Sequence, residues 1–266
     1  NEYEERFSDT VKRFLEQTNK DRTLETQEGY ATALRLFGEF IENKPLSQVT
    51  RPDAAYFRDK LTDLNPNWGK SYKSKSLTFS QICEKFGGDP KGLSVQTLQH
   101  YIGALRAIWN WYYEYEDEVP LDPFRGLVKK TKSKRSGPNL KQHSPYKDEE
   151  LVMLLVPLPK NDLLWKISYV ALYTGMRLEE ICQMKWGEFS REEGVLVYTV
   201  GDSKTQAGEN RKIPIHSRLE PLFINRKGKG PEEFVWNSLN THNARGNKGA
   251  VISKRFARHK QNRGLT

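Results

Sequence analysis

The sequence has few cysteines and no long apolar run. Only two of its 266 residues are cysteine, Cys83 and Cys182, and their spacing matches neither a disulfide framework nor a metal-binding motif. The apolar stretches are far too short to cross a bilayer, and residues 1–5 do not resemble a secretory signal peptide. We therefore expect a reduced, cytoplasmic protein without a membrane segment. A first residue other than methionine indicates a trimmed N-terminus.

Acidic residues are scarce in the second half of the chain. Residues 1–125 hold 17 Lys/Arg and 20 Asp/Glu, a net charge of −3, whereas residues 126–266 hold 26 and 14, a net charge of +12. Such an asymmetry indicates a polyanionic partner such as nucleic acid. A basic surface that serves only solubility explains the charge equally well.

Apolar residues at helical spacing predict that residues 1–125 form a small helical bundle. Thr50 and Ser94 are expected to cap two of the helices, because a hydroxyl at this position can accept a bond from a free backbone N–H. The aromatic run 109–113 is more typical of a core than of a ligand platform. The expected helices cover residues 3–17, residues 24–41, the segment after Thr50, a short stretch within 77–86 and a long segment after Ser94.

Residues 126–147 carry seven Lys/Arg and no Asp or Glu, together with Gly, Pro and Ser. This composition predicts a flexible basic linker. Most runs of this kind are solvated tethers, but a basic strap between two domains also suits a protein wrapped around DNA. The candidate phosphate contacts are Lys129, Lys130, Lys132, Lys134, Arg135 and Lys141 in this linker, with a second basic group at Lys70, Lys73 and Lys75.

Residues 148–266 are predicted to form a second domain that mixes helices with a β-hairpin. Residues 195–200 and 211–216 alternate as strands do, and the polar segment 201–210 joins them. The whole chain is therefore expected to be mainly α-helical with a small antiparallel sheet. The expected helices cover residues 148–155, 162–173, 177–186, 218–224 and 250–260, with Gly175 in a left-handed conformation after the second of these.

Arg177 lies at the expected start of a helix, where partial positive charge makes a cation unfavourable. A phosphate partner explains this placement, because free helix N–H groups and a guanidinium fork both bind phosphate oxygens. A salt bridge to Glu180, one helical turn away, is the alternative explanation. The residues alone leave both open.

The segment Thr174-Gly175-Met176-Arg177-Leu178-Glu179-Glu180-Ile181, followed by Met184-Lys185-Trp186-Gly187-Glu188-Phe189, resembles the first arginine box of the tyrosine recombinases, the phage integrase family. That box reads Thr-Gly-x-Arg-x-x-Glu, an apolar residue, and then Leu-x-Trp-x-Asp, so that Met184 and Glu188 depart mildly from it. Ser203-Lys204-Thr205 and Arg211-Lys212-Ile213-Pro214-Ile215 resemble the β-hairpin of the same family.

The resemblance implies a helical core-binding domain, a catalytic domain and double-stranded DNA with attachment-type sites as the partner, bound by several copies of the chain. Such enzymes cut one strand by tyrosine attack and conserve the bond energy in a 3′-phosphotyrosine, so that no metal or cofactor is needed. The resemblance assigns Arg177 to stabilisation of the transition state, Lys204 to protonation of the leaving 5′-oxygen and Glu180 to support of the arginine box. We add Arg211 to the expected DNA contacts. A bacterial or phage origin and action on chromosomal DNA follow from the same resemblance.

The resemblance also implies a His-x-x-Arg box and a nucleophilic tyrosine, and neither is convincing here. The last tyrosine is Tyr198, before Lys204, and His242-Asn243-Ala244-Arg245 lacks the apolar helix that the box should open. We expect a DNA-binding fragment of a recombinase that lacks the nucleophile and is inactive by itself. The alternative is a non-catalytic architectural or regulatory DNA-binding protein with the same architecture, and a metal-dependent nuclease is disfavoured because no acidic or histidine cluster has metal-ligand spacing.

Overall fold

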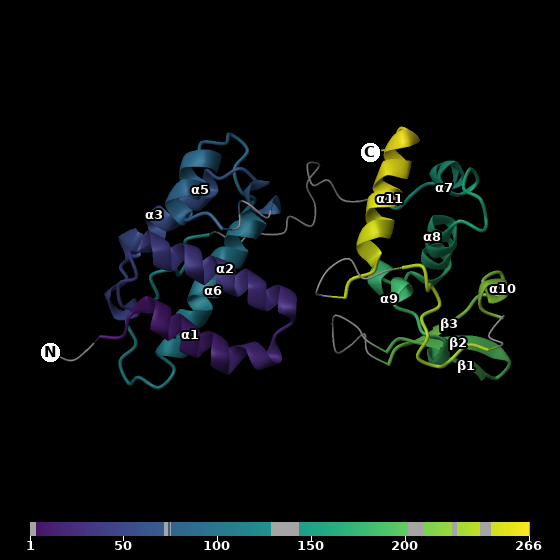
Figure 1. The fold of residues 1–266 in the computed structure, drawn as a ribbon, viewed down its shortest axis with the longest axis horizontal. Coiled ribbons are helices and arrows are strands. Elements are labelled where there is room, and N and C mark those ends of the chain that lie inside the picture. Colours follow the sequence, from purple (N-terminus) through teal and green to yellow (C-terminus); the bar gives the residue numbers. More distant parts are fainter. Residues whose placement is uncertain are drawn as a thin grey trace. The chain divides into compact units, whose positions relative to one another are not determined.

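The computed structural model describes residues 4–71, 74, 76–128, 144–201, 210–224, 228–239 and 246–265. The chain divides into two compact units, Asn1–Leu140 and Lys141–Thr266. Helices dominate both units, and a three-stranded antiparallel sheet lies in the second (Figure 1). The predicted fold class, mainly α with a small antiparallel sheet, is confirmed.

Side-chain caps begin most helices of the first unit. The hydroxyls of Thr50 and Ser94 accept bonds from the N–H groups of Asp53 and Thr97, as the sequence predicts. The carboxylate of Asp53 in turn accepts from the N–H of Thr50 at 2.8 Å and completes a capping box. The helices are α1 (Phe7–Thr18), α2 (Leu24–Phe40), α3 (Arg51–Thr62), α5 (Phe79–Phe86) and α6 (Val95–Tyr112).

Aromatic side chains fill the core of the first unit. The fully buried ring of Phe37, on α2, lies within 5.6 Å, centre to centre, of the rings of Phe7, Phe57 and Phe124. Trp109 on α6 is also buried, so that the aromatic run serves packing as predicted. α1, α2 and α6 pack against one another around this core.

The second unit places helices beside its sheet. Strands β1 (Phe189–Glu192), β2 (Val195–Thr199) and β3 (Lys212–Pro214) pair in that order, and Tyr198 lies opposite both Phe189 and Ile213. Figure 1 shows α8, α9 and α11 on one side of this sheet. The helices are α7 (Asp148–Leu155), α8 (Leu163–Thr174), α9 (Leu178–Cys182), α10 (Glu220–Phe223) and α11 (Gly249–Asn262).

The predicted helix over residues 177–186 is wrong in extent, because α9 ends at Cys182. The following residues instead pair with a distant segment. The carbonyl of Met184 accepts a bond from Val235 at 2.8 Å, and the N–H of Trp186 donates to Glu233 at 3.0 Å. These bonds use backbone groups that a longer helix would need, so the helix stops.

Candidate functional site

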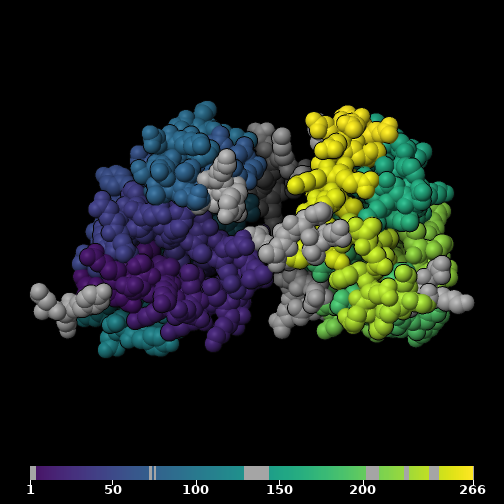
Figure 2. Space-filling model, viewed as in Figure 1, coloured from purple at the N-terminus to yellow at the C-terminus, as the bar shows by residue number. Residues whose placement is uncertain are grey.

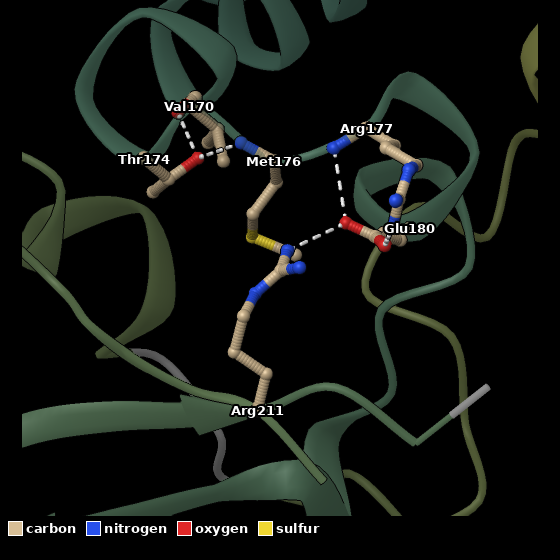
Figure 3. A network of polar contacts seen from close by, with 6 residues as sticks. All are labelled: Val170, Thr174, Met176, Arg177, Glu180 and Arg211. Atoms are coloured by element: carbon tan, nitrogen blue, oxygen red, sulfur yellow. Dashed lines mark hydrogen bonds and ion pairs between the residues drawn. The ribbon is translucent and has the colours of Figure 1, made fainter. Parts of the chain in front are cut away.

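The site begins at the end of α8, where the chain turns sharply. Gly175 has φ +63°, the left-handed conformation that the sequence predicts. The hydroxyl of Thr174 donates to the carbonyl of Val170 at 2.7 Å and accepts from the N–H of Met176 at 3.3 Å (Figure 3). The Met176 side chain is buried. This turn therefore fixes the direction of the chain between the end of α8 and Arg177.

Arg177 is the N-cap of α9, and Glu180 binds it twice. The Glu180 carboxylate accepts from the backbone N–H of Arg177 at 3.0 Å and from its Nη1 at 2.7 Å. The salt bridge considered from the sequence is thus present. α9 has only five residues and the N–H of its N-cap is bound to Glu180, so the helix dipole adds little to an anion site here. The Glu180 carboxylate thus holds the Arg177 guanidinium in a defined direction.

Arg211 brings a second guanidinium to the same carboxylate. Its Nη2 donates to Oε2 of Glu180 at 3.0 Å from a position just before β3. Figure 3 shows Arg211 reaching the carboxylate from the sheet, whereas Arg177 approaches from α9. The Glu180 side chain is 4% exposed, but those of Arg177 and Arg211 are 49% and 36% exposed. The structure therefore joins three residues that the sequence predicted for the site.

The charges of this arginine cluster, defined as Arg177, Glu180 and Arg211, favour an anion. Two guanidinium groups and one carboxylate give a formal charge of +1 at neutral pH. The negative charge is buried and the positive charges reach the surface. A fixed planar guanidinium can bind two oxygens of a phosphate and can stabilise charge that develops on them.

The neighbouring Glu179 ties α9 to α11. Its carboxylate accepts from the N–H groups of Lys248 and Gly249 at 2.7 and 2.9 Å. Negative charge at the start of a 14-residue helix is favourable, and the bonds satisfy two N–H groups that lack partners within the helix. Sequence reasoning missed this role, because no local pattern links two segments about 70 residues apart.

Two side chains near the cluster are unsuited to nucleophilic attack. Tyr198 on β2 is 2% exposed, and its hydroxyl donates to Glu188 at 2.8 Å. Burial raises the pKa of the Cys182 thiol to about 12, and the charge of Glu179 acts in the same direction. The thiol therefore stays protonated at neutral pH.

The remaining candidates are placed as follows. Lys70 is exposed at the end of a short 3₁₀ turn, Trp68–Lys70. Lys204, the segment His242-Asn243-Ala244-Arg245 and the other candidate DNA contacts, namely Lys73, Lys75, Lys129, Lys130, Lys132, Lys134, Arg135 and Lys141, lie outside the described residues. Within the described ranges no His, Cys, Asp or Glu group could hold a metal ion. In the same ranges, no helix combines the length and apolarity of a membrane span.

The sequence was compared with family models and with named proteins. No family model matches the sequence. The tyrosine recombinase XerA of Pyrococcus furiosus is 25% identical over 274 aligned positions, which cover 92% of this chain and 84% of that protein. The chain is therefore similar in sequence to a tyrosine recombinase over most of its length. A tyrosine recombinase of Pseudothermotoga lettingae is also 25% identical, over 61% of this chain and 54% of its own length.

Solved structures confirm the tyrosine recombinase fold. A lambda integrase dimer bound to a core site aligns with 98% of this chain and 83% of its own, at a TM-score of 0.59 and 14% identity. The XerH recombinase bound to its difH substrate aligns with 97% of this chain and 69% of its own, at a TM-score of 0.56 and 16% identity. The resemblance to this family that the sequence indicates is thus supported by the named relatives and by the fold.

Proposed function

We propose that this chain is a tyrosine recombinase that binds duplex DNA and holds a phosphodiester at the Arg177 guanidinium, as part of site-specific recombination. One observation carries the proposal: the Arg177 guanidinium is held by a buried carboxylate and is still half exposed. A guanidinium serving only stability has no need of this exposure. One that meets a ligand needs both a fixed direction and access.

The chemistry follows from the charge on phosphorus. When a nucleophile attacks a phosphodiester, negative charge grows on the non-bridging oxygens. A positioned guanidinium lowers the energy of that state more than that of the ground state, which is the condition for catalysis. Glu180 keeps Arg177 in place, and we assign Lys204 to protonation of the leaving 5′-oxygen.

The complete reaction, strand cleavage through a 3′-phosphotyrosine, also needs a tyrosine at the phosphorus. Tyr198 does not fit this role, because it is buried and its hydroxyl is hydrogen-bonded to Glu188, directly before β1. We therefore propose that residues 1–266 bind and polarise the phosphodiester without cutting it. The alternative, an architectural DNA-binding protein, differs in that Arg177 would contribute nothing to cleavage in any longer form.

Positive charge at several places supports a DNA partner. The linker 126–147 supplies seven Lys/Arg without acid. On the second unit, α11 lies at the surface (Figure 2), and three of its cations, Lys254, Arg255 and Arg258, are exposed. The lambda integrase and XerH structures contain DNA, and integrase dimers and tetramers are among them. By analogy we propose that several copies of this chain assemble on an attachment-type site in chromosomal DNA, in the cytoplasm.

A salt titration of DNA binding tests the phosphate contact. Affinity for a labelled duplex should fall steeply with salt, with a log–log slope of about −0.9 per phosphate neutralised. Arg177→Ala should make the slope less negative by about 0.9. Arg191→Ala is the matched control, because Arg191 is 56% exposed and pairs with Glu220 at 2.9 Å on the same unit. Equal effects of the two substitutions would refute the proposed role of Arg177.

A nicked suicide substrate tests the missing chemistry. Residues 1–266 should form no covalent adduct that survives boiling in detergent, because Tyr198, the last tyrosine of the chain, is buried and hydrogen-bonded to Glu188. In a longer protein that supplies the tyrosine, Arg177→Ala should lower the rate of adduct formation by roughly 10²–10³. An adduct from residues 1–266 would contradict the proposal, and Tyr198→Phe would be the first variant to examine.

A further inference from the structure

Arg211 joins the start of β3 to the end of β2, and Lys204 lies between these two strands in the sequence. Its carbonyl accepts a bond from the N–H of Val200 at 3.0 Å, and the N–H of Asn210 donates to the carbonyl of Val200 at 2.8 Å. Asn210 has φ +56°, so the chain turns there into β3. Backbone bonds therefore join Val200 to Asn210 and Arg211, the described residues on either side of Lys204 in the sequence.

The side chain of Arg211 connects the start of β3 to α9. It reaches Glu180, 31 positions earlier in the sequence, and shares Oε2 of that carboxylate with the backbone N–H of Arg177. The other oxygen, Oε1, accepts from Nη1 of Arg177. One buried carboxylate thus sets the position of both guanidinium groups.

We propose that Arg211 is a positioning residue: it holds Glu180, and through it Arg177, and fastens both to the hairpin that carries Lys204. This inference rests on the proposed function of Arg177 as the phosphate contact. Arg211 acts through its bond to Glu180 and not through a bond to DNA. Its side chain is about two-thirds buried and less exposed than that of Arg177, which fits this division.

A double-substitution cycle on DNA affinity separates positioning from direct contact. Arg177→Ala, Arg211→Ala and the double variant are titrated with duplex DNA at several salt concentrations. Arg211→Ala should weaken binding by no more than Arg177→Ala does. In the Arg177→Ala background it should change affinity by less than about twofold, because independent residues add and a shared action does not.

Glu180→Gln and Arg211→Gln complete the test. With Glu180→Gln as the background, Arg211→Ala should again have little effect, because the carboxylate that it holds is gone. Arg211→Gln carries no charge but keeps a donor for Glu180, and should bind DNA better than Arg211→Ala. Thermal midpoints of all variants identify any that fail to fold, and Arg211→Gln then replaces Arg211→Ala in the cycle.

Two results would overturn the inference. The first is additive losses of DNA affinity, with a log–log salt slope that is less negative by about 1.8 in the double variant. That result would show that Arg211 neutralises a phosphate of its own. Unchanged DNA binding in Arg211→Ala would show that it positions nothing. A failure of the proposed function looks different: Arg177→Ala would then match the Arg191→Ala control, whatever Arg211 does.

Discussion

Replacing Gly175 by alanine tests whether the turn before Arg177 depends on a left-handed residue. Gly175 has φ +63°, and a Cβ added there would meet no atom within 4 Å. The substitution therefore introduces no clash, and its cost comes from the backbone alone. This isolates one physical effect at a position two residues from the proposed phosphate contact.

The expected cost follows from two opposing contributions. A residue with a Cβ loses about 1–2 kcal/mol in the left-handed conformation. Alanine also restricts the unfolded chain, which returns about 0.4–1 kcal/mol. We expect a net loss of about 0.5–1.5 kcal/mol in the free energy of unfolding of the second unit. Gly103→Ala on α6 should have the opposite sign, because Gly103 has no positive φ, is exposed and also has open space around it.

Hydrogen exchange resolves the two units within one protein. The slowest amides of α8, around Ile167 and Val170, should exchange about two- to tenfold faster in Gly175→Ala, since 1.4 kcal/mol corresponds to tenfold. Amides of α6 should exchange more slowly in Gly103→Ala. Unchanged or slower exchange of α8 in Gly175→Ala would refute the argument that the turn requires glycine.

Three further substitutions test other parts of the chain. Phe37→Ala should lower the stability of the first unit by about 3–5 kcal/mol in urea denaturation, because its fully buried ring contacts several others; a loss below about 1 kcal/mol would contradict the packing described. Burial alone would raise the pKa of Asp53, but bonds from Lys44 and Thr50 outweigh it and lower that pKa. The stabilisation is then present above the unfolded pKa of about 3.9 and lost as pH falls through the folded pKa. Asp53→Asn should therefore cost about 1 kcal/mol at pH 7 and progressively less as the pH is lowered through the folded pKa; a cost that does not fall with pH would contradict the argument. Replacing the linker cations by alanine should weaken binding to every duplex and flatten the salt dependence without moving the thermal midpoint, and a collapsed midpoint would show a structural role. The cations to replace are Lys129, Lys130, Lys132, Lys134 and Arg135.

The sequence by itself determined the features that depend on neighbouring residues. Thr50 and Ser94 mark helix starts because a hydroxyl there reaches an N–H three residues ahead. Gly175 marks a helix end because only glycine enters the left-handed region at little cost. The motif around Arg177 resembles the family's arginine box, and its spacing places Arg177 and Glu180 within reach across one turn.

Only the tertiary structure decided the features that join distant segments. β1 has a single apolar residue, Phe189, and becomes a strand because β2 lies beside it. α9 stops at Cys182 because the next residues bond to 233–235. The sequence predicted Arg211 as a DNA contact, but its guanidinium is bonded to Glu180, 31 positions away. A buried carboxylate binds whichever donors the fold brings to it, and no local pattern of residues encodes which ones arrive.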